Sequence, residues 1–104
     1  MRISLDERMR SAVAALLHTT GESQADLAAA LGVSQAQVSR RQSGTAAWSL
    51  TDCDAVATHY GIGTLDLLAG PTQAMEALPD QRFRPVERSA AGTRRQAVQD
   101  GSVR

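Results

Sequence analysis

The chain has 104 residues, which is enough for one small domain, and 42% of them are hydrophobic. Its only aromatic residues are Trp48, Tyr60 and Phe83, so the core must consist of aliphatic side chains, which favours packed helices over a β-sandwich. The single cysteine, Cys53, excludes an intrachain disulfide and a multi-cysteine zinc site, and we expect neither metal nor cofactor. No apolar run approaches the ~18 residues that span a membrane and no signal-peptide core is present, so we expect a cytoplasmic protein.

The charges cancel overall but are unevenly distributed. Eleven arginines, with no lysine, balance eleven acidic residues. Residues 1–79 hold five of the arginines against eight acids, whereas residues 80–104 hold six arginines against three acids. An acidic body followed by a basic segment is typical of chains that contact a polyanion, and equally of chains with a solvated tail.

The first expected helix follows Ser4, with Glu7 in place to complete a capping box. It carries apolar residues at helical spacing and ends near Gly21. These apolar residues are Leu5, Met9, Ala12, Val13, Leu16 and Leu17.

Two shorter helices follow. Ser23 caps the second helix with Asp26 near the reciprocal position, and Gly32 ends it. The third helix begins after Ser34 and ends at Gly44.

A fourth helix, capped by Ser49 or Thr51, is expected to end at Gly61. Its inward residues are expected to be Leu50, Cys53, Val56, Ala57 and Tyr60. A fifth, short helix contains Leu65, Leu67 and Leu68 and ends at Gly70-Pro71, and residues 73–78 allow one more turn before Pro79. We therefore expect an all-α, compact five-helix domain over residues 1–79 and a flexible, disordered basic tail over residues 80–104.

The second and third helices are separated only by Gly32-Val33-Ser34, which is the spacing of a helix-turn-helix. Ala28 is small where the helices cross, Gly32 tolerates positive φ, and Val33 and Val38 anchor the turn and the third helix. The rest of the third helix is polar and can read base edges in a major groove.

The stretch "SQADLAAALGVSQAQVSR" resembles the helix-turn-helix of the lambda-repressor-like (Cro/cI, or Xre) family. The resemblance continues through "WSLTDCDAVATHYGIGTLDLLAG", similar to that family's fourth and fifth helices, and covers about residues 4–70.

The resemblance implies a role for individual residues. The residues that would face the bases are Gln35, Ala36, Ser39 and Arg40. The residues that would contact phosphates are Gln24, Ser34, Gln37, Arg41, Gly44 and Thr45, the Gly44-Thr45 segment through its backbone amides. Many relatives have an apolar residue in place of Arg41 and an acid or leucine in place of Gln42. In some of them that acid pairs with an arginine where this chain has Leu17. The role of Arg41 stays open between a phosphate contact and packing of its own helix.

The most favoured function is sequence-specific binding of double-stranded DNA to repress transcription, as in small phage immunity repressors or Cro-like regulators. If the chain dimerises, we expect the homodimer contact within residues 65–78. No catalytic constellation is present, so we do not expect an enzyme, and we interpret His18, His59 and Trp48 as structural. Three alternatives remain: an antitoxin whose tail wraps a toxin partner, a protein-interaction module with this fold that binds no DNA, and a DNA-bending architectural factor.

Overall fold

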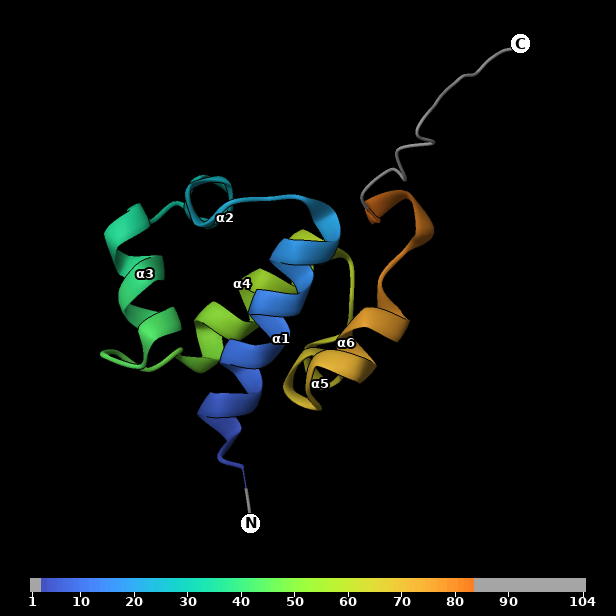
Figure 1. The fold of residues 1–104 in the computed structure, drawn as a ribbon, viewed down its shortest axis with the longest axis horizontal. Coiled ribbons are helices and arrows are strands. Elements are labelled where there is room, and N and C mark those ends of the chain that lie inside the picture. The colour runs from blue at the N-terminus through green and yellow to red at the C-terminus, as the bar shows by residue number, and fades with distance from the viewer. Residues whose placement is uncertain (1–2, 84–104) are drawn as a thin grey trace, which may run out of the picture.

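The computed structural model describes residues 3–83, which form an all-α domain with no strand in that range. Figure 1 shows the helices gathered around α1. The elements are α1 (Leu5–Thr20), α2 (Gln24–Leu31), α3 (Gln35–Ser43), α4 (Leu50–Tyr60), α5 (Thr64–Leu68), α6 (Pro71–Ala77) and a 3₁₀ turn, η1 (Asp80–Arg82). No helix of residues 3–83 is long and apolar enough to cross a membrane.

Serine caps begin the first four helices, as the sequence predicts. The side chains of Ser4, Ser23, Ser34 and Ser49 each accept a hydrogen bond from the backbone amide three residues later. The side chain of that later residue accepts from the serine amide in return, which completes a capping box at every one of these helices. The cap of α4 is therefore Ser49 and not Thr51.

The expected number of five helices is wrong, because α6 is a sixth. Pro71 does end the preceding segment, but it also occupies the first turn of α6, where its fixed φ and missing amide hydrogen are favourable. Ala74 and Leu78 bury their side chains in the core, and α6 packs closely against α1.

The ordered chain also extends past the predicted boundary at residue 79. Residues 80–83, expected as part of the tail, continue through η1 to Phe83. The remainder of the predicted tail, residues 84–104, lies outside the described residues.

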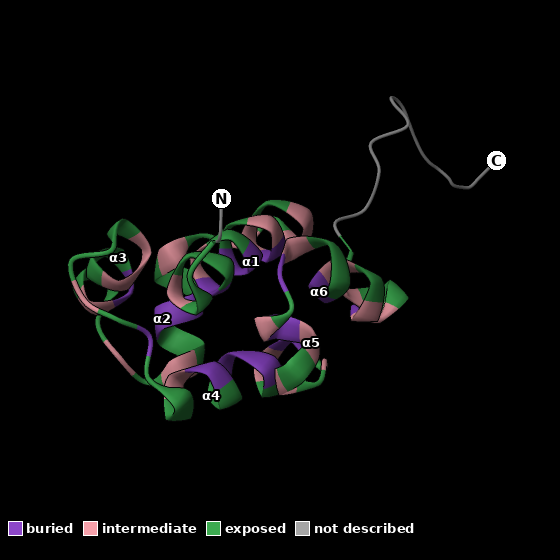
Figure 2. Cartoon of the chain, turned by 90° about the horizontal axis from the view of Figure 1, so that it is seen from below, coloured by how far each residue is buried: buried purple, intermediate pink, exposed green. Residues whose placement is uncertain are grey.

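One apolar core holds the helices together. In Figure 2 its buried residues lie on the sides of the helices that turn toward one another. They include Met9, Val13, Leu16, Leu27, Val38, Val56, Tyr60 and Leu67. Leu50, expected to face inward, is instead 75% exposed, and Leu65 is 83% exposed.

A polar cluster around Glu22 joins the last described residues to the turn between α1 and α2. The Tyr60 hydroxyl donates to Glu22 Oε1 at 2.9 Å, and His59 Nε2 lies 3.1 Å from both carboxylate oxygens. Arg82 Nη2 donates to Glu22 Oε2 at 3.2 Å. Burial raises the pKa of Glu22, but the hydrogen bonds from His59 and Tyr60 and the charges of His59 and Arg82 outweigh it and lower the pKa from 4.5.

The two leucines of α5 provide a matched test of this packing. Leu67→Ala removes a fully buried side chain and should lower the free energy of unfolding by about 2–5 kcal/mol. Leu65→Ala, on the exposed side of the same helix, should change it by less than about 0.5 kcal/mol. Urea denaturation followed by circular dichroism measures both, and equal losses would contradict the assignment of the core.

The Glu22 cluster should make stability sensitive to acid. Because the folded protein lowers the pKa of Glu22, the stabilisation is complete above pH 4.5 and is lost as the pH falls through the folded pKa. Glu22→Gln should therefore be less stable than the wild type at neutral pH and should lose less stability on acidification. Unfolding curves between about pH 7 and pH 3 compare the two, and identical slopes would refute a lowered pKa.

Candidate nucleic-acid interface

The turn between α2 and α3 is short and tightly bonded. Gly32, at φ +73°, ends α2, and the Val33 amide donates to the Ala28 carbonyl at 3.0 Å. Leu27 and Ala28 on α2 and Val38 on α3 are buried, and Val33 is partly buried against them. A left-handed glycine followed by a capping serine thus sets the angle between the two helices.

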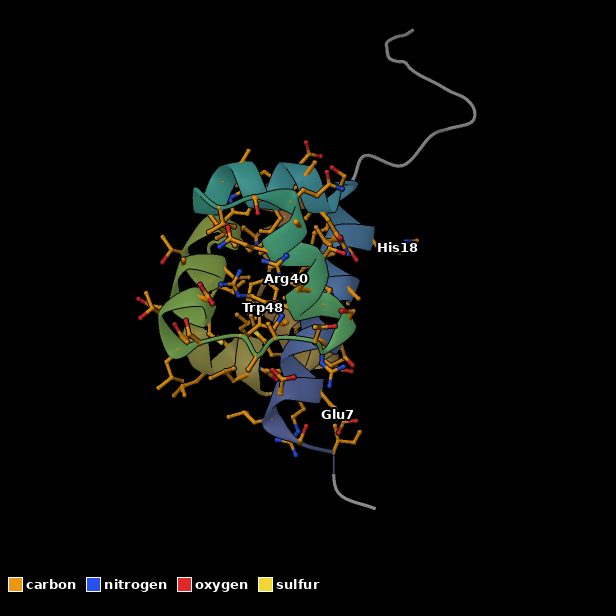
Figure 3. The ribbon with its side chains drawn as sticks, turned by 90° about the vertical axis from the view of Figure 1, so that its left-hand side faces the viewer. Glu7, His18, Arg40 and Trp48 are labelled. Carbon is orange, nitrogen blue, oxygen red and sulfur yellow. The ribbon has the colours of Figure 1, made fainter. Side chains whose placement is uncertain are left out.

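The outward side of α3 carries the predicted base-reading residues together. Successive residues turn by about 100°, so positions 35, 36, 39 and 40 share one arc, and all four are exposed. The side chains of Gln35, Ser39 and Arg40 form no hydrogen bond or ion pair with any other residue in the range 3–83. Figure 3 looks onto this side, with α2 crossing above α3 and Arg40 on the middle of α3. The arc therefore presents unengaged donors and acceptors.

Two of the predicted phosphate ligands form the cap of α3. Ser34 Oγ accepts from the Gln37 amide at 3.1 Å, and Gln37 Oε1 accepts from the Ser34 amide at 2.8 Å. The Ser34 hydroxyl hydrogen and the Gln37 amide group are the atoms left to donate to a ligand. The third, Gln24, lies half-buried in the first turn of α2, immediately after the Ser23 cap.

Arg41 points away from the exposed arc and into the fold. Its Nε lies 3.1 Å from Asp52 Oδ2 at the start of α4, and its guanidinium lies 5.8 Å from the centre of the Trp48 ring. Of the two roles left open for Arg41, the structure shows packing, because an internal carboxylate already compensates its charge. The assignment of Arg41 as a phosphate ligand stays a prediction, because the ion pair engages only its Nε.

Gln42 links α3 to α1 and to the following loop, a role that the sequence analysis missed. Its Nε2 donates to the Arg10 carbonyl at 3.1 Å, and its Oε1 accepts from the Trp48 indole Nε1 at 3.0 Å. Trp48 is buried and also donates its backbone amide to Asp6 at 3.3 Å. The available signal was position: Gln42 stands four residues after Val38, on the core side of α3.

The amides of the Gly44-Thr45 segment are already bonded. The Gly44 amide donates to the Arg41 carbonyl at 3.3 Å and the Thr45 amide to the Arg40 carbonyl at 3.0 Å. This corrects the expectation that these amides are offered to a phosphate, and the Thr45 hydroxyl lies 3.0 Å from the Ser43 hydroxyl. Gly44, at φ +87°, also lies where an added Cβ would come within 2.8 Å of Arg10 Nη1, so the Arg10 side chain covers the end of α3.

We name these contacts the α3 clamp, defined as Gln42 with Trp48 and the Arg10 carbonyl, together with Arg41 and Asp52. The clamp joins the core side of α3 to α1 and α4 through polar contacts, and it leaves the opposite side free. Arg10 itself pairs with Asp6 at 3.1 Å.

Two further features concern possible metal ligands and the single thiol. Residues 3–83 contain no group of three or more histidine, cysteine or acidic side chains that could hold a metal ion. Burial raises the pKa of the Cys53 thiol, and the nearby Asp52 and Asp6 carboxylates raise it further, which disfavours the reactive thiolate.

The comparisons with known proteins give one family. A BetR domain model matches residues 4–99, so the chain belongs to the BetR domain family. The matched range continues beyond α6 and through η1. No curated protein and no solved structure matches the chain.

Truncating Gln42 tests the α3 clamp. Gln42→Ala removes both hydrogen bonds and leaves the Trp48 indole N–H without its partner, so the free energy of unfolding should fall by about 1–3 kcal/mol. The matched control, Gln35→Ala, lies on the exposed arc of the same helix and should change it by less than about 0.5 kcal/mol. Chemical denaturation measures both variants, and equal stability of Gln42→Ala and the wild type would contradict the clamp.

Proposed function

We propose that this member of the BetR domain family binds duplex DNA in a sequence-specific manner and represses transcription. The observation that carries the proposal is the combination of a fixed helix, α3, with an outward arc of unengaged Gln35, Ser39 and Arg40. An α-helix with its side chains is 10–12 Å across and fits a major groove of about 12 Å. A lambda-repressor-like helix-turn-helix domain is the architecture that we infer on this basis.

The arc has the chemistry for reading bases. Arg40 can donate two hydrogen bonds to the O6 and N7 atoms of guanine, and Gln35 can form a bidentate pair with adenine. Ala36 offers an apolar contact for a thymine methyl, and Ser39 can donate to or accept from either kind of base edge. Gln24, Ser34, Gln37 and Thr45 supply the polar contacts to phosphates that set the register of the helix.

The exposed leucines support a weak homodimer. Several apolar side chains within residues 65–78 are buried in the core, including those of Leu67, Ala74 and Leu78. Leu65 is the large apolar side chain that remains well exposed there. A cavity of about 190 Å³ lined by Leu5, Leu50 and Leu68 among others lies between α1, α4 and α5. We propose that two copies meet over α5 and that each presents α3 to one half-site of an inverted repeat, one helical turn apart. Such a regulator would act in the cytoplasm, on the DNA of the cell.

A second candidate is a protein-interaction module that does not bind DNA, and the charge distribution favours it. Within residues 3–83, Arg10, Arg41 and Arg82 pair with carboxylates, which leaves Arg8 and Arg40 as the arginines without an ion pair. Since neutralised phosphates supply much of the affinity for DNA, so few unpaired cations within residues 3–83 give this domain weak non-specific binding. This candidate predicts no binding to any duplex even at low salt.

The test is a selection of bound fragments from a pool of random duplexes, followed by titration of the enriched sequence. We expect a short enriched motif and an affinity that falls with salt. Equal affinity for the enriched and the random duplex would refute sequence-specific binding.

Arg40→Ala should remove discrimination at one base pair. Loss of a bidentate contact to guanine should cost about 1–3 kcal/mol in binding of the enriched duplex and much less in binding of the duplex with that guanine replaced. Fluorescence anisotropy titrations on both duplexes measure the difference, with Arg8→Ala as the control for loss of one unpaired positive charge. An equal loss on the two duplexes would assign Arg40 to a phosphate.

A further inference from the structure

Arg82 follows the six helices in the chain, and its side chain contacts the residue that immediately precedes the helix-turn-helix. It is the last residue of η1, and its guanidinium reaches Glu22 in the turn between α1 and α2, with Nη2 at 3.2 Å from Oε2. Figure 1 shows the end of the described chain beside the connection from α1 to α2. The guanidinium also lies 5.3 Å from the centre of the Tyr60 ring, which fixes its direction.

The negative charge of Glu22 lies where it would oppose the binding of a phosphate. It immediately precedes Ser23, the cap of α2, and stands two residues before Gln24, which we propose to contact a phosphate. A helix N-terminus attracts an anion, whereas a carboxylate beside it repels one. Its side chain keeps 20% of its surface exposed, so its charge acts on solvent and on any ligand there.

The carboxylate does not depend on Arg82 alone to stay in position. The Tyr60 hydroxyl and His59 Nε2 already contact it from α4, at 2.9 Å and 3.1 Å. What Arg82 adds is a full positive charge, and the BetR domain match extends through this part of the chain to residue 99.

We propose that Arg82 is a positioning residue for DNA binding, which compensates the charge of Glu22 at the end of α2 that faces a phosphate. This inference rests on the proposed function. It assigns to the segment after α6 a contribution to DNA affinity that does not involve contact with the bases.

The experiment titrates the enriched duplex with the full chain and five variants at one fixed salt concentration. Arg82→Gln removes the arginine charge from Glu22, leaves it only the contacts with His59 and Tyr60, and should weaken binding about fivefold. Glu22→Gln should bind as tightly as the wild type or more tightly, and the double variant Arg82→Gln/Glu22→Gln should return to within about twofold of the wild type.

The matched control changes the same net charge elsewhere. Glu76 is exposed on α6, so Arg82→Gln/Glu76→Gln has the net charge of the rescued variant but leaves Glu22 without the arginine charge. It should stay as weak as Arg82→Gln. Arg82→Lys keeps the charge and should bind like the wild type, and circular dichroism melts restrict the titrations to temperatures at which every variant is folded.

Each outcome bears on the proposal. Unchanged affinity of Arg82→Gln overturns it, as does failure of Glu22→Gln to rescue, which would mean that Arg82 contacts phosphate itself or acts through the fold. Equal rescue by Glu76→Gln overturns it in favour of a net-charge effect. A wild type that selects no sequence overturns the proposed function and this inference together, whereas a wild type that selects a sequence isolates the inference.

Discussion

The geometry of the outward arc of α3 depends on the polar contacts on its opposite side. Within α3 only Val38 is fully buried, so apolar burial alone gives this nine-residue helix a small anchor. Gln42 adds one hydrogen bond to the Arg10 carbonyl and another to the Trp48 indole, and Arg41 adds an ion pair with Asp52. Partly buried polar groups of this kind are costly when unpaired, so these contacts favour one orientation of the helix over its alternatives.

Contacts within the fold also compensate most of the arginine charges of the described residues. Three of the arginines in residues 3–83 neutralise carboxylates within the fold, at Asp6, Asp52 and Glu22. The described domain therefore offers little general attraction for a polyanion, and the proposed affinity of this domain for DNA depends on directed contacts. Arg40 then matters more than its single charge suggests, because it lies on the one side of α3 that is not engaged. In the same way, the proposed compensation of the Glu22 charge by Arg82 matters because few other cations of the described residues are unpaired.

Local patterns were sufficient to predict most of the fold. Serine caps and terminal glycines specify helix ends through contacts within three or four residues, and the bounds of the first four helices follow from them. The patterns gave a wrong prediction at Leu50, which was expected to face the core and is exposed. They also missed α6, because Pro71 can both end one segment and stand in the first turn of the next helix. The α3 clamp could not be derived from sequence because its contacts join residues up to 32 positions apart, from Gln42 to Arg10. Its polar members also read as ordinary surface residues until the helices are packed.

Mapping the amide resonances of the labelled full chain during titration with the enriched duplex tests most directly whether α3 is the surface that reads DNA. Binding through the outward arc predicts that the largest shifts fall in α3 and in the first turn of α2, with small shifts in α5 and α6. Largest shifts in α5 and α6, with α3 unchanged, would contradict it and would turn attention to the exposed leucines as the binding surface.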